Sequence, residues 1–268
     1  VNIRQPSFQW RSSLVFSLNR NELVTLLGID SDGDGVEDDL ISEELFIGES
    51  LNSIYDYYTT GELWQLDEYF ADEIPPTADL GSYKILDNDG NGVINPEDRK
   101  ILGTSDPLFR IALDNRFRYK NWELSFFINS ILGNDKYYLG QDDMMSFNVL
   151  NGHMWDNRIF PANYRDLWTP ENPDARYQRQ GVRLSSGLLA RRYRPRSFAR
   201  LQDLEISYTF NKSILDKLSM QDLRLSFHAK NLFTLTNWNG WDPETGEKVN
   251  MSGRPVLRGY TLGLEVKF

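Results

Sequence analysis

The feature that most constrains this chain is an alternation of apolar and polar residues that recurs in about seven segments and is weaker in one of them, 54–63. It is clearest over 260–268, where every second side chain is apolar and the residues between are polar or small. The apolar face there consists of Tyr260, Leu262, Leu264, Val266 and Phe268. The same alternation predicts strands over 8–18, 54–63, 109–118, 122–129, 204–210 and 223–233. Period-two alternation is typical of β-strands, so the sequence predicts an all-β fold.

Two architectures suit strands with one apolar and one charged face. In a soluble β-sandwich the apolar face packs against a second sheet, whereas in an outer-membrane β-barrel it meets lipid and the charged face lines a wet lumen. The connections favour the barrel, because the turn at 119–122 and the link 210–221 are short while 133–197 and 235–253 are long. Short turns at one end and long loops at the other are typical of bacterial outer-membrane barrels.

Composition excludes several classes of protein. The 268 residues include 29 Lys and Arg against 39 Asp and Glu, and the resulting net charge of −10 disfavours a nucleic-acid partner. The absence of cysteine excludes thiolate sites, and His153 and His228 stand in no zinc or triad context. The adjacent carboxylates Asp142 and Asp143 are interpreted as solvated loop charge. We therefore expect no enzyme.

Two acidic loops have the spacing of calcium-binding loops. Calcium takes roughly six to eight oxygen ligands, which this spacing folds around one point. The expected ligands are Asp30, Asp32, Asp34, Val36 and Asp38 in loop 30–39, and Asp87, Asp89, Asn91, Val93 and Asp98 in loop 87–98. Ile41 stands where the last ligand of the first loop would be, so Asp38 or Asp39 has to replace it. The alternative is a pair of Gly-rich and Asp-rich turns without metal.

Aromatic residues in the long loops are candidate contacts for a substrate. They are Trp155, Tyr164, Trp168, Trp238 and Trp241. Aromatic rings can stack on sugar rings or bases, and they can equally pack the loops together.

Six segments also form an ordered set along the chain. They are 47–61 (with Ser53-Ile54-Tyr55-Asp56-Tyr57), 83–103, 167–173, 197–210, 230–244 and 260–268. This set resembles the SusC/RagA family of TonB-dependent outer-membrane transporters of Bacteroidota. The resemblance covers nearly the whole chain and is specific because of its order. Ala199 and the acidic stretch 30–39 depart from the family pattern.

The resemblance implies that residues 1–268 are the C-terminal part of a large transmembrane antiparallel β-barrel, without its plug domain and N-terminal strands. It implies a place in the bacterial outer membrane and active, TonB-dependent uptake of oligosaccharides, or of peptides as in the RagA branch. The implied partners are a SusD-like surface lipoprotein, TonB through the missing N-terminal part, and the rest of the barrel and plug. A soluble calcium-stabilised β-sandwich that binds carbohydrate remains the other alternative.

The strand count also predicts which end each loop occupies. Counting back from Phe268 puts 236–253, 133–197 and loop 87–98 outside the cell. Because 54–63 is counted as a strand of the barrel, the same count puts loop 30–39 on the periplasmic side, opposite loop 87–98.

Overall fold

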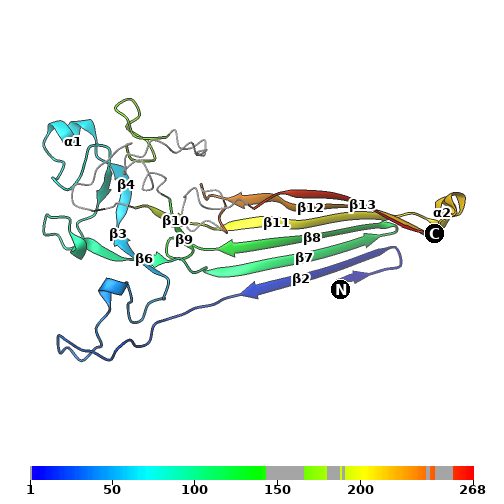
Figure 1. The fold of residues 1–268 in the computed structure, drawn as a ribbon, viewed down its shortest axis with the longest axis horizontal. Coiled ribbons are helices and arrows are strands. Elements are labelled where there is room, and N and C mark those ends of the chain that lie inside the picture. Colours follow the sequence, from blue (N-terminus) through cyan, green and yellow to red (C-terminus); the bar gives the residue numbers. More distant parts are fainter. Residues whose placement is uncertain (1, 143–165, 180–187, 189–190, 240–241, 245–255) are drawn as a thin grey trace.

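Seven strands form one antiparallel sheet in the computed structural model, which describes residues 2–142, 166–179, 188, 191–239, 242–244 and 256–268. In sheet order they are β1 (Ile3–Arg4), β2 (Phe8–Ser17), β7 (Phe109–Tyr119), β8 (Trp122–Leu132), β11 (Phe198–Thr209), β12 (Asp222–Thr236) and β13 (Gly259–Lys267). Sheet order follows chain order, so the sheet is an up-and-down meander (Figure 1). The predicted all-β fold is confirmed.

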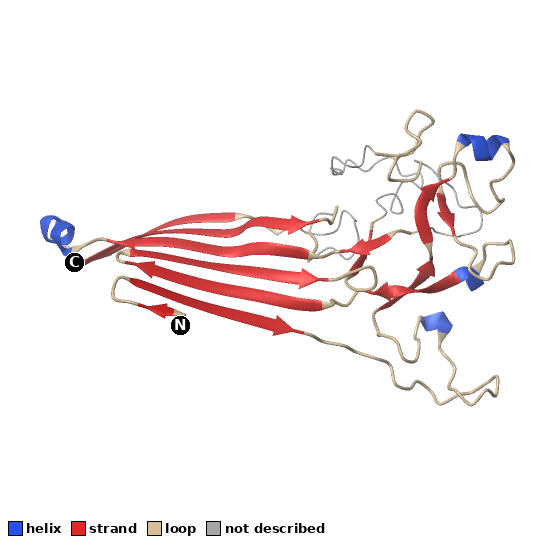
Figure 2. Cartoon of the chain, turned by 180° about the vertical axis from the view of Figure 1, so that it is seen from behind, coloured by secondary structure: helices blue, strands red, loops and turns tan. Residues whose placement is uncertain are grey.

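The remaining elements are short, and all but one gather at one end of the sheet (Figure 2). Three two-stranded ladders pair β3 (Ser53–Tyr57) with β6 (Arg99–Thr104), β4 (Thr59–Leu63) with β5 (Tyr83–Ile85), and β9 (Leu139–Gln141) with β10 (Tyr193–Pro195). The short helices there are η1 (Ile41–Glu43), α1 (Leu66–Phe70) and η2 (Pro96–Asp98), while α2 (Lys212–Leu218) lies at the opposite end. We call the first the long-loop end and the second the short-turn end.

Two details of the strand prediction are wrong. Residues 54–63 form β3 and β4, which lie outside the large sheet. The seventh strand of that sheet is instead β1, an edge strand that the alternation does not predict. As a result, the whole segment between β2 and β7 lies at the long-loop end. Loop 30–39 therefore lies at the same end as loop 87–98, and not at the opposite end as the strand count predicts.

The pairing register aligns apolar side chains into rows on one face of the sheet. One row contains Trp10, Phe117, Leu124, Ile206, Phe227 and Leu262. Much of this face is uncovered, with Leu14 68% and Leu262 74% exposed. No second sheet of the described residues packs on it, as the β-sandwich alternative requires.

The opposite face carries ion pairs. Arg118 Nη2 lies 3.3 Å from Glu123 Oε2, and Arg224 Nη2 lies 3.1 Å from Glu205 Oε1. His228 lies on this face too, with Nε2 3.8 Å from the same carboxylate oxygen of Glu205. Charge on one face and apolar side chains on the other is therefore a property of the folded sheet as well as of the sequence.

A bulge keeps this segregation intact along β11. The register of β11 against β8 and β12 shifts between Leu201 and Asp203, which leaves Gln202 without a partner in the ladder. If Gln202 took a regular place in the ladder instead, Asp203 and every later residue of β11 would change face, because side chains alternate with a period of two. The bulge thus lets Leu201 and Leu204 both join the apolar face.

One polar group stands on the apolar face with its own partner. Asn115 is two residues from both Leu113 and Phe117, so its side chain lies on the same face as theirs, and it is buried. Its Oδ1 accepts a hydrogen bond of 2.9 Å from the indole Nε1 of Trp10 on the neighbouring strand. This bond satisfies a buried amide that would otherwise cost about 1–3 kcal/mol.

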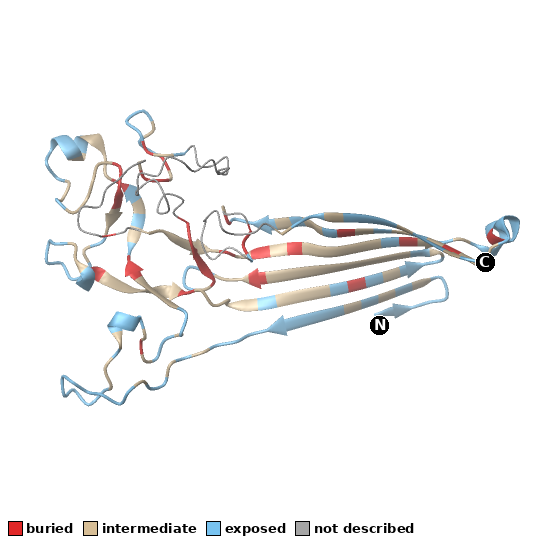
Figure 3. Ribbon diagram, viewed as in Figure 1, coloured by how far each residue is buried: buried red, intermediate tan, exposed pale blue. Residues whose placement is uncertain are grey.

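Many of the buried side chains lie at the long-loop end rather than along the sheet (Figure 3). One cluster joins Leu63, Tyr83, Trp168 and Ala175, and a second joins Ile131, Tyr138 and Phe198 where the sheet meets the loops. None of the described helices is long and apolar enough to cross a membrane.

Candidate functional site

The two acidic loops share one pattern of backbone hydrogen bonds. In each, the first carboxylate accepts from the N–H groups of two glycines at 2.7–3.0 Å: Asp30 from Gly33 and Gly35, and Asp87 from Gly90 and Gly92. These glycines have φ between 75° and 86°, which side chains disfavour. The turn that wraps the backbone around the carboxylate therefore depends on glycine at these positions.

In loop 87–98 the last carboxylate is fully buried. Asp98 Oδ1 accepts from the N–H of Asn88 at 2.7 Å, and its Oδ2 accepts from the N–H of Asn95 at 2.8 Å. Carboxylate oxygens of Asp87, Asp89 and Asp98 lie within 4.8 Å of one another. The loop therefore gathers three of its five expected ligands. The other two, Asn91 and Val93, lie in the same turn.

Loop 30–39 closes in the same way with a shorter span. Asp38 Oδ2 accepts from the N–H of Ser31 at 2.8 Å, just as Asp98 accepts from Asn88 in the other loop. Oxygens of Asp30, Asp32 and Asp38 lie within 4.8 Å of one another, a group that does not include Asp34. Asp39 turns away and accepts from the N–H of Ile47 at 2.7 Å. Asp38 is therefore the residue that closes this loop.

Hydrogen bonds favour the charged form of one carboxylate in each loop. The N–H of Gly92, followed by that of Gly90, lowers the pKa of Asp87. Hydrogen bonds from the side chain and the backbone of Ser31 lower the pKa of Asp38. Ionised, closely spaced carboxylates are the donor set that a hard cation such as calcium prefers.

The structure separates from solvent the two candidate stacking aromatics that it describes, Trp168 and Trp238. Trp168 is 1% exposed, packs in the cluster with Leu63 and Tyr83, and donates from Nε1 to Gln65 Oε1 at 3.0 Å. Trp238 is also buried. Neither ring is available for stacking on a ligand, so packing of the loops is their role. Trp155, Tyr164 and Trp241 lie outside the described residues.

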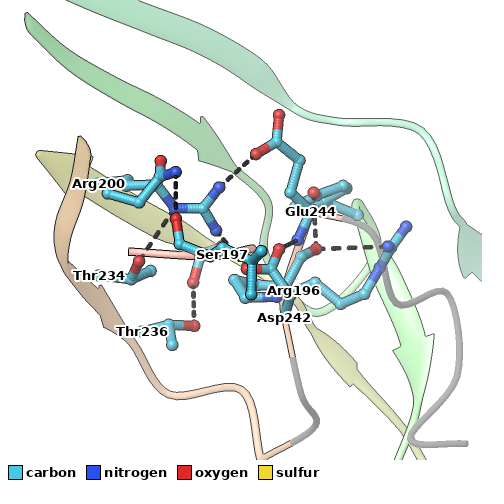
Figure 4. Close-up of polar contacts among 11 residues, drawn as sticks. Arg196, Ser197, Arg200, Thr234, Thr236, Asp242 and Glu244 are labelled. Carbon is cyan, nitrogen blue, oxygen red and sulfur yellow. Dashed lines mark hydrogen bonds and ion pairs between the residues drawn. The ribbon is translucent and has the colours of Figure 1, made fainter. Parts of the chain in front are cut away.

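A buried arginine fastens the loop after β12 to the end of the sheet (Figure 4). Arg200 is 2% exposed and reaches Asp242 Oδ2 at 2.7 Å, Glu244 Oε2 at 2.6 Å and Thr234 Oγ1 at 3.0 Å. The hydroxyl of Tyr138 donates to the carbonyl of Pro243 at 2.9 Å. Residues 242–244 are thus held over the long-loop end of β11 and β12.

A second group of arginines surrounds two buried carboxylates. Asp142 is fully buried, with Oδ2 3.1 Å from Arg176 Nη2 and 3.3 Å from Arg194 Nη1. Asp56 Oδ2 lies 2.9 Å from Arg191 Nη1 and accepts from the hydroxyl of Tyr193 at 2.8 Å. The interpretation of Asp142 as solvated loop charge is therefore wrong. Its arginine partners come from segments 34 and 52 residues away, which no local pattern reveals.

Burial also shifts the titration of three tyrosines at this end. It raises the pKa of Tyr138 and of Tyr177 to about 12. It raises the pKa of Tyr193 as well, with the charge of Asp56 acting in the same direction. All three phenols stay protonated well above the pH at which an exposed tyrosine ionises.

Known proteins align with this chain from end to end. TonB-dependent receptor P3 of Formosa agariphila is 28% identical over 290 residues, which cover 100% of this chain and 27% of the receptor. TonB-dependent receptor P26 of the same organism is 27% identical, and TonB-dependent receptor SusC of Bacteroides thetaiotaomicron is 23% identical over 97% of this chain and 24% of SusC. The predicted resemblance to this kind of receptor is confirmed. The chain spans about a quarter of the length of these relatives, and no family model matches it.

Solved structures show the same fold. The RagAB peptide transporter has a TM-score of 0.62 at 19% identity, covering 99% of this chain and 28% of the transporter chain. The RagAB peptide importer in its open-open state has a TM-score of 0.61 at 16% identity. At such identities the likeness establishes the fold alone.

The raised tyrosine pKa values predict a loss of stability at high pH. Between pH 10 and about 12 the unfolded chain loses the phenol proton of Tyr177 while the folded chain keeps it, so the free energy of unfolding falls as pH rises. In the complete protein, Tyr177→Phe is expected to weaken the fall of the thermal midpoint over this range. The exposed Tyr69→Phe is the matched control. Equal pH slopes in wild type and Tyr177→Phe would contradict the assignment.

Proposed function

We propose, from its end-to-end homology with TonB-dependent receptors, that this chain forms barrel wall and external loops of a bacterial outer-membrane transporter that imports oligosaccharides. The observation that carries the proposal is the uncovered apolar face of the seven-stranded meander, with Leu14, Leu262 and Leu264 each at least 67% exposed. A contiguous exposed apolar face of this kind suits hydrocarbon rather than water.

The two edges of the sheet support a place within a larger barrel. β1 and β13 each pair with one neighbour only among the described strands. Unpaired strand edges are not tolerated in lipid, where each free N–H or C=O costs several kcal/mol. In the proposed transporter, further strands of a longer protein close the barrel against these edges, and a plug domain fills it.

The long-loop end is the proposed outer surface. Both acidic loops, the short ladders and the loop fastened by Arg200 lie there. A SusD-like lipoprotein is the proposed partner at this surface, and TonB is the proposed partner on the periplasmic side, where the short-turn end lies. No covalent chemistry is assigned to the chain: the relatives are named receptors and transporters.

Peptide import is the second candidate. It is favoured by the solved structures that share the fold, which are described as a peptide transporter and a peptide importer. Oligosaccharide import is favoured by the sequence relatives, among them SusC, under the family resemblance stated above.

Uptake by living cells tests the proposed function. Deleting the gene for the complete transporter is expected to abolish uptake of its fluorescently labelled oligosaccharide, and deleting TonB is expected to do the same. The complete gene supplied in trans restores uptake. Loss of peptide uptake with oligosaccharide uptake intact would establish the second candidate instead, and unchanged uptake of both would contradict import altogether.

A pair of neighbouring substitutions tests which face of the sheet meets lipid. Leu262 belongs to the apolar row and Thr261 to the opposite face. An arginine facing the bilayer midplane costs about 2–4 kcal/mol. Leu262→Arg in the complete protein is therefore expected to reduce the heat-modifiable folded band in the outer-membrane fraction, whereas Thr261→Arg leaves it close to wild type. Equal losses in both variants, or a loss in Thr261→Arg alone, would contradict the proposed orientation.

We also propose that loops 30–39 and 87–98 bind calcium and order the outer end of the molecule. The support is geometric: each loop brings three carboxylates together within 4.8 Å. Unit charges this close repel one another unless a cation lies between them. Asp98 immediately precedes β6, so a metal in the second loop would fix the start of that strand.

Calcium is therefore expected to raise the thermal midpoint of the complete protein and a chelator to lower it. The stabilisation follows RT ln(1 + [Ca²⁺]/Kd), about 2.7 kcal/mol at a hundredfold excess over Kd. Asp98→Asn is expected to remove most of the response of its loop. The neighbouring Glu97→Gln, which removes an exposed charge from the same segment, is the matched control. A midpoint indifferent to calcium and chelator would contradict the proposal.

A further inference from the structure

Positive charge is concentrated around β10 in a chain whose net charge is −10. Five cationic side chains lie there: Lys100, Arg176, Arg191, Arg192 and Arg194. The carboxylates of the described residues beside them are Asp56, Asp135 and Asp142, and Glu44 lines a neighbouring pocket together with Arg191. Five cations against four carboxylates leave a local surplus of one positive charge. We call these five side chains the cationic cluster.

Two members of the cationic cluster form no ion pair among the residues that the structure describes. Arg192 donates from Nη1 to the carbonyl of Arg176 at 2.8 Å, and its guanidinium lies 5.6 Å from the ring centroid of Tyr83. Lys100 lies with Nζ 4.6 Å from the ring centroid of Tyr58. Both are half-buried, where a charge without a counter-ion is less well solvated than in water.

The paired members are held in place but not covered. The side chains of Arg176, Arg191 and Arg194 are 30%, 38% and 33% exposed, while the carboxylates of Asp56 and Asp142 behind them are buried. A guanidinium has five N–H donors, of which one carboxylate oxygen uses only one or two. The buried carboxylates thus fix the direction of the guanidinium groups and leave part of each group accessible.

A cavity of about 200 Å³ opens beside the cluster. Lys100 and Arg191 line it together with Tyr58, Thr59, Asp135 and Tyr193. At roughly 30 Å³ per water molecule it holds about seven waters, which is the scale of one sugar unit rather than of a whole oligosaccharide. Cations, a hydroxyl and a half-exposed aromatic ring therefore meet around a space for a single small group.

We propose that the cationic cluster and its cavity bind an acidic sugar unit of the imported glycan, through its carboxylate or sulfate group. Arg191 and Lys100 contact the anion at the cavity wall, and Arg192 and Arg194 supply positive potential along β10. Arginine binds carboxylates and sulfates through bidentate hydrogen bonds, and the fixed guanidinium groups lose little conformational entropy on binding. The inference rests on the proposed function, since it names the substrate class of that importer.

A glycan fits these observations better than an acidic peptide. The cations are Arg191, Arg192 and Arg194 around β10 and Lys100 on β6, so several donors surround one place. This arrangement suits a ligand whose charged group is attached to a rigid ring, because several donors can then contact that group at once. The tyrosine and threonine beside the cations offer a ring surface and a hydroxyl that a pyranose uses. Binding of a peptide is an outcome of the test below.

The test uses the complete transporter, purified in detergent, and the combined variant Lys100→Gln/Arg192→Gln. Neither side chain has an ion pair in the described structure, so the fold is expected to persist. The control Lys120→Gln/Lys217→Gln removes the same charge at the short-turn end. Calorimetric titrations compare tetragalacturonate, a sulfated carrageenan tetrasaccharide, neutral maltotetraose and tetraglutamate as probes, each at low and high salt.

One of the two acidic glycans is expected to bind the wild-type protein, with lower affinity at high salt than at low salt. Its affinity for the test variant is expected to be lower by a factor of about ten or more, whereas the control variant binds it as the wild type does. Binding of the uronate and of the sulfated probe separates the two anion sources. Preference for maltotetraose or tetraglutamate, equal affinity in the test variant, or no binding of either acidic glycan would overturn the inference. If the wild-type transporter carries neutral glycans into cells, the proposed function stands although the inference fails. If the wild-type transporter carries no glycan into cells, both fail.

Discussion

The fold is governed by one constraint: an antiparallel sheet that is apolar on one face and charged on the other, with nothing of the described chain covering the apolar side. Apolar rows such as the one from Trp10 to Leu262 cannot face water over the whole sheet without a large free-energy cost. The bulge at Gln202 and the bond between Trp10 and Asn115 both preserve this face, the first by keeping side-chain parity and the second by satisfying a polar group. A bilayer is the surrounding that suits the sheet.

The long-loop end is stabilised by polar interactions rather than by an apolar face. It is held by ion pairs that each contain at least one buried charge, among them Arg200 with Asp242 and Glu244, and Asp142 with Arg176 and Arg194. Buried ion pairs add little net stability because desolvation offsets their attraction, but breaking one is costly. Such pairs fix loops in one arrangement, which suits a surface that must present particular side chains to a ligand.

Local patterns in the sequence predict the strands that are long and regular. The alternation is strict in β13 and nearly complete in β12 and β7, and the structure has those strands where the pattern predicts them. Residues 54–63 alternate too, yet they pair with β6 and β5, because partner choice depends on segments that are distant in sequence. β1 has only two residues, too few for any periodicity. The acidic loops were predictable because all of their residues are local, including Asp38. The burial of Asp142 was not, because it depends on Arg176 and Arg194, although the run of arginines from Arg191 to Arg200 was a visible signal.

The central claim is that the apolar face of the meander meets lipid and the charged face meets water. Spin labels at single engineered cysteines report this directly, because the 268 residues contain no cysteine of their own and any cysteine elsewhere in the complete transporter is first replaced by serine. In the complete transporter reconstituted in bilayers, labels at Leu225→Cys and Leu262→Cys should collide with dissolved oxygen and be shielded from a water-soluble nickel complex. Labels at Ser226→Cys and Thr261→Cys should show the reverse. Equal access of the nickel complex to both faces, or the opposite pattern, would contradict the account.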